Sequence, residues 1–203
     1  MGPYIHSTLE LGLVFSKRSN SLLETFIHFP LPNSSTTSYT PPLATFCDAN
    51  WGPQDASHPS PTNTRPVSIH ESKSICGHIF FFYGGCRILW KTHKEARISR
   101  SSCKAQIKAT YKCIKNIQMF RHILTDLGLA PHQPTPLYND NRGAVEWSNS
   151  FCTKGMCHLN IRENAVREAQ LMQEVFISHI SGTCNPADIF TKEFKSDCTF
   201  RSL

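Results

Sequence analysis

The sequence lacks any apolar run long enough to cross a bilayer and lacks the marks of an exported protein. No uninterrupted apolar segment approaches the roughly 20 residues that a membrane-spanning helix needs. The first residues, MGPYIHSTLELGLVF, have no basic start followed by a continuous apolar core, so they do not form a secretory signal. We therefore expect an intracellular protein, cytoplasmic or nuclear, that does not associate with membranes.

Closely spaced cysteine pairs are also missing. The nine cysteines are odd in number and widely scattered, and no two of them form a C-x-x-C motif. This pattern favours reduced intracellular thiols over a disulfide framework. One part of the chain holds enough cysteine and histidine residues to ligate zinc, but these residues lack the paired short spacing of zinc ribbons and knuckles. They are Cys152, Cys157, His158, His179 and Cys184.

Acidic residues are scarce in the middle of the chain. Between Arg87 and Arg121, ten Lys and Arg residues stand against a single acid, Glu95, so this block carries +9. Because the whole chain carries +6, the remainder carries −3. A concentrated basic block is typical of a surface that binds a polyanion such as nucleic acid. A solvated helix face explains the same charges equally well, so both interpretations stay open.

The local patterns predict an α/β protein that follows an irregular leader. Eight of the 13 prolines lie between residues 30 and 66, so most of that region is expected to be loop or extended chain. Beyond it, apolar runs and helical periodicity predict three strands, a long helix, a strand, two helices, a strand and a last helix. Their expected ranges are 43–48, 75–83, 87–92, 101–127, 137–139, 142–149, 160–174 and 175–180, with the last helix beginning near Pro186. This mixture indicates a sheet with an antiparallel half and a parallel half.

The long helix is expected to begin after an N-cap at Ser101 or Ser102 and to carry two stripes. One stripe is apolar and recurs every three or four residues, which predicts a face packed on the sheet. It comprises Ile107, Tyr111, Ile114, Ile117, Phe120, Leu124 and Leu127. The other stripe is cationic and comprises Lys104, Lys108, Lys112 and Lys115. Trp51 and Trp90 could stack on sugars or bases, but core packing is the favoured expectation for both.

Three aspartates occupy similar local positions. Asp48 and Asp140 end predicted strands, and Asp188 lies near the start of the last helix. Carboxylates gathered at strand ends can hold hard divalent ions, and a two-metal site stabilises both oxygens of a phosphoryl transfer. Turn and capping roles are also common for aspartate at such positions. The residues alone leave both interpretations open.

Several motifs, in order, resemble the RNase H domain that ends copia-type long-terminal-repeat retrotransposon polyproteins. They read FCDANWG, SICGHIFFFYGGCRILWKTHKE, SRSSCKAQIKAT, LYNDNRGAV, CHLNIRENAVREA and NPADIFTK, and they span about residues 43–197. The leader segment YIHSTLELGLVFS resembles the connection that follows the reverse transcriptase. The resemblance implies an RNase H-like fold, a mixed five-stranded sheet flanked by helices. It also implies a linker over 1–42, the domain over 43–197, a tail over 198–203 and an upstream reverse transcriptase in the intact polyprotein.

The resemblance further implies a two-ion Mg²⁺ site that cleaves the RNA strand of an RNA–DNA hybrid. By motif, Asp48, Asp140 and Asp188 are its metal-binding aspartates. Gln106 stands where the family has its metal-bridging Glu, and Lys104 replaces a second Glu nearby. Because an amide offers one neutral oxygen and an NH₂ group that repels metal, we expect ion binding and cleavage to be impaired.

Other residues receive roles from the same resemblance. His179 lies near the position of a mobile histidine that assists turnover in many RNase H enzymes, although copia-type sequences often have Tyr there. Residues expected to contact nucleic acid are Lys91, Lys104, Lys108, Lys112 and Asn141. Three functions stay open: an impaired nuclease, a binding module that has lost its chemistry, and a pseudogene product with no present role.

Overall fold

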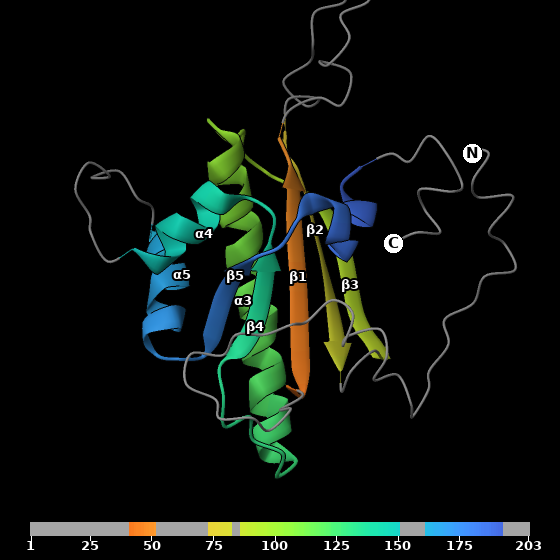
Figure 1. Cartoon of the computed structure of the whole chain (residues 1–203), viewed down its shortest axis with the longest axis vertical. Helices are drawn as coiled ribbons and strands as arrows, with labels where there is room; N and C mark the ends of the chain where they lie inside the picture. The colour runs from red at the N-terminus through yellow and green to blue at the C-terminus, as the bar shows by residue number, and fades with distance from the viewer. Residues whose placement is uncertain (1–40, 52–72, 83–85, 151–160, 193–203) are drawn as a thin grey trace, which may run out of the picture.

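The computed structural model describes residues 41–51, 73–82, 86–150 and 161–192, and these form one five-stranded sheet with helices packed on it (Figure 1). The strands are β1 (Leu43–Asn50), β2 (Ile75–Phe82), β3 (Cys86–Lys94), β4 (Thr135–Asn139) and β5 (Val175–His179). Their order is β3-β2-β1-β4-β5. β1 pairs antiparallel with β2, and β2 with β3, whereas β1 pairs parallel with β4, and β4 with β5. The predicted mixed sheet, antiparallel in its first three strands, is confirmed.

The helices are α3 (Ser102–Asp126), α4 (Arg142–Asn149) and α5 (Ile161–Leu171), followed by the 3₁₀ helices η2 (Gly182–Cys184) and η3 (Pro186–Phe190). The expected last helix is therefore only a short 3₁₀ helix within the described residues. Asn185 caps its start by accepting the backbone N–H of Ala187, and Pro186 occupies its first position. None of the described helices is long and apolar enough to cross a membrane.

The long helix α3 begins where the sequence predicts. The Ser101 side chain accepts the backbone N–H of Lys104, which satisfies one of the donors left free at a helix start. The helix ends at Leu127, and Gly128 follows with φ of 74°, a left-handed conformation that glycine adopts without strain. Leu127 was expected on the buried face, but it is exposed because the helix has already ended there.

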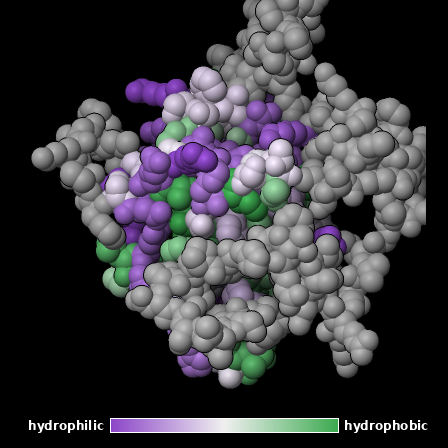
Figure 2. Space-filling model, in the orientation of Figure 1, coloured by the Kyte–Doolittle hydropathy of each residue, from purple (hydrophilic) through white to green (hydrophobic). Residues whose placement is uncertain are grey.

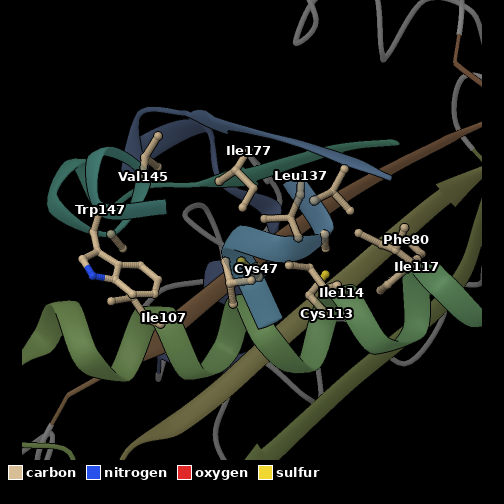
Figure 3. Packing of buried hydrophobic residues seen from close by; sticks show 14 of the residues in the cluster. Cys47, Phe80, Ile107, Cys113, Ile114, Ile117, Leu137, Val145, Trp147 and Ile177 are labelled. Carbon is tan, nitrogen blue, oxygen red and sulfur yellow. The ribbon is translucent and has the colours of Figure 1, made fainter. Parts of the chain in front are cut away.

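The main hydrophobic core lies between α3, α4 and α5 and one face of the sheet (Figure 3). Ile114 and Ile117 of α3 point toward the sheet, and Ile107 points toward α4, where Trp147 lies. The other face holds a smaller cluster, in which Phe46, Ile79 and Tyr138 pack with Ala187 of η3. Since Phe80 belongs to the first cluster and Phe81 packs on the second, both faces of β2 are covered, as the continuous Phe run predicts.

The exposed surface is largely polar, with some exceptions. Hydrophilic residues gather over α4 and α5 on the face shown in Figure 2. Trp51 and Trp90, which were expected in the core, are about half exposed. Trp51 keeps one polar contact, because its indole N–H donates to the backbone carbonyl of Ser99 at 2.8 Å. Trp90 lies on β3, an edge strand of the described sheet whose residues are all half-buried or exposed, so little of the protein covers its side chain.

Candidate active site

Three aspartates that are far apart in the sequence come together at one end of the sheet. Asp48 lies near the end of β1, and Asp140 directly follows β4. Because these two strands are parallel neighbours, their carboxyl ends meet at the same edge. Asp188 lies on η3, which packs against β1. Carboxylate oxygens of the three residues lie within 4.8 Å of one another.

The carboxylates in this cluster repel one another in a buried setting. Asp48 is only 2% exposed and Asp188 only 7%. Burial, reinforced by the neighbouring charge of Asp48, raises the pKa of Asp140 to about 6. Burial also raises the pKa of Asp188 to about 6, with further contributions from Asp48 and Asp140. A cation placed among these carboxylates would relieve the repulsion.

The partners of the aspartates do not occupy every carboxylate oxygen. The Thr191 hydroxyl donates to Asp48 Oδ2, and the Lys192 ammonium pairs with Asp188 Oδ2. Burial opposes the charge on Lys192, but the aspartates outweigh it and raise the pKa of that ammonium. Asp188 Oδ1 is buried and has no hydrogen-bond partner. Since hard divalent ions prefer carboxylate oxygen, the three aspartates fit such an ion.

Gln106, in the first turns of α3, directs its amide nitrogen into this cluster. Its Nε2 donates to Asp48 Oδ1 at 2.8 Å, to the backbone carbonyl of Ala49 at 3.1 Å and to Asp140 Oδ1 at 3.3 Å. The side chain is buried, so these contacts are shielded from water. Gln106 therefore joins two of the aspartates by neutral donors rather than by a shared cation.

The orientation of the Gln106 amide follows from a chain of hydrogen bonds that starts at a backbone N–H, a group that can only donate. The backbone N–H of Asn141 can only donate, and it contacts Asn139 Oδ1 at 2.8 Å. The Asn139 NH₂ group therefore faces Gln106 and donates to its Oε1 at 2.9 Å. With its oxygen committed to Asn139, Gln106 presents NH₂ to the carboxylates. Sequence reasoning did not single out Asn139. A polar residue at the end of an otherwise apolar strand was the signal that could have identified it.

Two lysines of the cationic stripe on α3 are ion-paired within the protein. The Lys104 ammonium lies 3.3 Å from Glu163 on α5, and the Lys112 ammonium lies 2.5 Å from Glu95. Both glutamates are buried, so these pairs tie α3 to neighbouring elements. The two lysines thus have protein partners in addition to any role at a nucleic-acid surface.

The remaining residues expected to contact nucleic acid differ in their surroundings. Lys108 donates to Ser99 Oγ at 3.0 Å and to the carbonyl of Arg97 at 3.4 Å. Lys91 is exposed on β3. Asn141 caps α4, because its Oδ1 accepts the backbone N–H of Ala144 at 2.9 Å.

His179 lies beside the aspartate cluster, at the end of β5. It is exposed, and its Nε2 lies 3.1 Å from the backbone carbonyl of Asp140. Cys184, on η2, makes a 3.8 Å contact with Thr183. Cys152, Cys157 and His158, the other ligands considered for zinc, lie outside the described residues.

Comparison with known proteins identifies related polyproteins. No protein-family model matches the chain. It is 30% identical over 126 residues to the retrovirus-related Pol polyprotein from transposon TNT 1-94 of Nicotiana tabacum, a match covering 61% of this chain and 9% of that protein. It is 28% identical over 120 residues to the Pol polyprotein from transposon RE1 of Arabidopsis thaliana, covering 59% of this chain and 8% of that protein. The chain thus spans less than a tenth of the length of these curated relatives.

Comparison with solved structures identifies the fold. The chain is similar to LC11-RNase H1, isolated from compost, with a TM-score of 0.52 and 13% identity over 75% of this chain and 94% of that one. The same enzyme in complex with an RNA/DNA hybrid gives a TM-score of 0.51 and 11% identity, over 73% of this chain and 93% of that one. The expected RNase H-like fold and the expected resemblance to copia-type elements are confirmed. The chain is therefore related to the Pol polyproteins of retrotransposons, and its described residues adopt the RNase H fold.

Proposed function

We propose that this chain is a retrotransposon RNase H domain in which cleavage of the RNA strand of RNA–DNA hybrids is impaired by Gln106. The observation that supports this proposal is the direction of the Gln106 amide. Its NH₂ group donates to Asp48 and Asp140, and its oxygen is held by Asn139. A carboxylate at this position would instead add one negative charge and two ligand oxygens to the cluster.

Asp48, Asp140 and Asp188 are the residues that would hold Mg²⁺. A bound ion would supply Lewis-acid stabilisation of the charge that develops on phosphoryl oxygens. Asp188 Oδ1, which is buried and unpaired, is the best-prepared ligand atom of the three residues. Lys192 already places an ammonium against the other oxygen of Asp188, so an incoming cation meets a competing charge there. Gln106 and Lys192 together supply donors to all three aspartates and so compete with a metal ion for their oxygens.

The substrate and partner proposals follow from the relatives. LC11-RNase H1 is known in complex with an RNA/DNA hybrid, and we extend that ligand class to this chain. The Pol polyprotein relatives support an upstream reverse transcriptase as the partner in an intact polyprotein. In this proposal residues 43–197 form the domain, residues 1–42 the connection to that partner and residues 198–203 a tail.

The direct test is cleavage of a labelled RNA–DNA hybrid by the full chain in Mg²⁺ and in Mn²⁺. We expect little or no cleavage by the natural chain and a clear gain in the variant Gln106→Glu. A matched control is Gln118→Glu, because Gln118 lies on the same helix and its Nε2 also donates to a carboxylate, Glu174 Oε2, at 2.8 Å. Efficient metal-dependent cleavage by the natural chain would show that the bridging-ligand argument is wrong.

A second candidate, a non-catalytic nucleic-acid-binding module, is favoured by one group of residues. Lys91, Lys94, Arg97 and Arg100 are all exposed along the end of β3 and the segment after it. Such a basic group attracts phosphates without metal, and its affinity for nucleic acid falls as the salt concentration rises. We expect hybrid binding in EDTA that falls with salt and weakens in Lys91→Glu, with Lys115→Glu on α3 as the control. Binding that does not respond to salt would exclude this candidate.

A further inference from the structure

A second group of potential metal ligands lies where β2 meets the end of β3. Cys76 on β2 and His93 on β3 are directly opposed partners in the antiparallel ladder. Glu95 follows β3, and its backbone N–H donates to the carbonyl of Ser74 at 2.8 Å, which continues the β2–β3 pairing by one residue and keeps Glu95 near Cys76. One ligand atom from each of Cys76, His93 and Glu95 lies within 4.8 Å of the others. No sequence motif indicated this group.

Three donors converge on a single oxygen in this group. Glu95 Oε1 is 3.3 Å from Cys76 Sγ, 3.2 Å from His93 Nε2 and 2.5 Å from the Lys112 ammonium. With Zn–S near 2.3 Å and Zn–N or Zn–O near 2.0–2.2 Å, tetrahedral ligands lie about 3.3–3.6 Å apart. The sulfur–oxygen and nitrogen–oxygen separations are thus already close to those of a zinc site. His93 Nδ1 is buried without a partner, so the imidazole depends on the Nε2 contact alone for hydrogen bonding.

We propose that Cys76, His93 and Glu95 bind one borderline-soft divalent cation of the zinc class. On binding, the Cys76 thiol releases its proton to solvent and bonds to the cation as thiolate. The His93 imidazole gives its Nε2 proton to solvent and takes one up on Nδ1, so that it remains neutral and its Nε2 lone pair is free to bond to the cation. The ammonium of Lys112 leaves Glu95 for solvent. The local charge is zero before binding, from Glu95 and Lys112, and zero afterwards, from the cation, the thiolate and Glu95.

Lys112 is the competitor in this exchange rather than a fixed part of the site. Its side chain is 35% exposed, whereas that of Glu95 is 8% exposed, so Lys112 can turn outward while Glu95 stays in place. The sulfur ligand sets the preference for zinc over magnesium. The sulfur ligand also distinguishes the metal preference of this group from that of Asp48, Asp140 and Asp188, which offer only oxygen ligands.

The test is titration of the full chain with Co²⁺ under a non-thiol reducing agent, followed by displacement with Zn²⁺. We expect a thiolate-to-cobalt charge-transfer band that saturates at one equivalent and disappears in Cys76→Ser. The matched control is Cys86→Ser, at the opposite end of β3, which should retain the band. Lys112→Met should bind at least about fivefold more tightly, because a competing charge is removed. Persistence of the band in Cys76→Ser, or weaker binding in Lys112→Met, would overturn the proposal.

A second measurement needs no change in the buried Cys76. X-ray absorption of the natural chain loaded with one equivalent of Zn²⁺ should show one sulfur among nitrogen and oxygen neighbours. Ligation by nitrogen and oxygen alone would overturn the proposal, since it would place the ion elsewhere. This absorption measurement uses only the natural chain, so it tests the proposal even if the Cys76→Ser variant does not fold.

Discussion

Changing Gln106 to Glu is predicted to destabilise the metal-free protein substantially. The variant loses the Gln106 NH₂ group, whose two hydrogens are shared among Asp48 Oδ1 at 2.8 Å, the Ala49 carbonyl at 3.1 Å and Asp140 Oδ1 at 3.3 Å. Hydrogen bonds to charged groups contribute about 1.5–3 kcal/mol each, and the longer one less. The new carboxylate also adds repulsion to a cluster in which burial already raises the pKa of Asp140 and Asp188 to about 6. We expect a loss of roughly 3–5 kcal/mol in the free energy of unfolding at pH 8 in EDTA.

The response to Mg²⁺ should distinguish the two proteins. A ligand present at about 100 times its Kd stabilises the folded state by about 2.7 kcal/mol, so saturating Mg²⁺ should restore much of the lost stability in Gln106→Glu. The natural chain should respond weakly. Urea unfolding of both proteins with EDTA and with Mg²⁺ measures this, and Gln118→Glu should show no dependence on Mg²⁺. If Gln106→Glu is as stable as the natural chain in EDTA, the account of the Gln106 contacts is wrong.

Three further predictions concern stability. His78 is buried with its pKa lowered to about 4 from 6.5, mainly by burial, so the stability it contributes is present above pH 6.5 and lost as pH falls toward 4. Urea unfolding in EDTA should show the difference between the natural chain and His78→Gln changing by about 3 kcal/mol over that range, and a constant difference would refute it. In Gly77→Ala the new Cβ would lie 2.5 Å from η3, so a loss of about 1–3 kcal/mol is expected in thermal unfolding, whereas Gly143→Ala on α4 should be neutral or stabilising. Ser101→Ala removes the N-cap of α3 and should cost about 1 kcal/mol, while Ser102→Ala, one residue into the helix, should not.

Much of the fold could be predicted because local patterns determine its elements. The helix over 142–149 matches its predicted bounds, and the strands around Cys47 and Ile177 lie where apolar runs place them. The length of the last helix was not predictable in this way, because Pro186 and Asn185 specify only where it starts. The exposure of Trp90 depends on how little of the protein covers β3 in three dimensions, which local sequence does not encode.

The site was predictable only in part. Asp48, Asp140 and Asp188 were identified by motif, and the structure brings them together through the parallel pairing of β1 with β4 and the packing of η3. The contacts of Asn139 and Thr191 depend on side-chain directions in three dimensions, so the motifs gave no account of them. The group of Cys76, His93 and Glu95 escaped notice for a related reason. Its members are brought together by the antiparallel register of β2 and β3, which continues to Ser74 and Glu95, rather than by a recognisable spacing.

The partners of β1 also determine when the site can assemble during synthesis. The Thr191 hydroxyl that contacts Asp48 lies 143 residues later in the chain, and Asn185, which donates to the Cys47 carbonyl, lies 138 residues later. A ribosome adding about 5–20 residues per second needs on the order of ten seconds to span that interval. During that time the hairpin of β2 and β3 and the helix α3 can form, but the acidic end of β1 stays without its last neighbours. For that interval we expect Asp48 to be open to solvent and to ions, until η3 is made and packs over it.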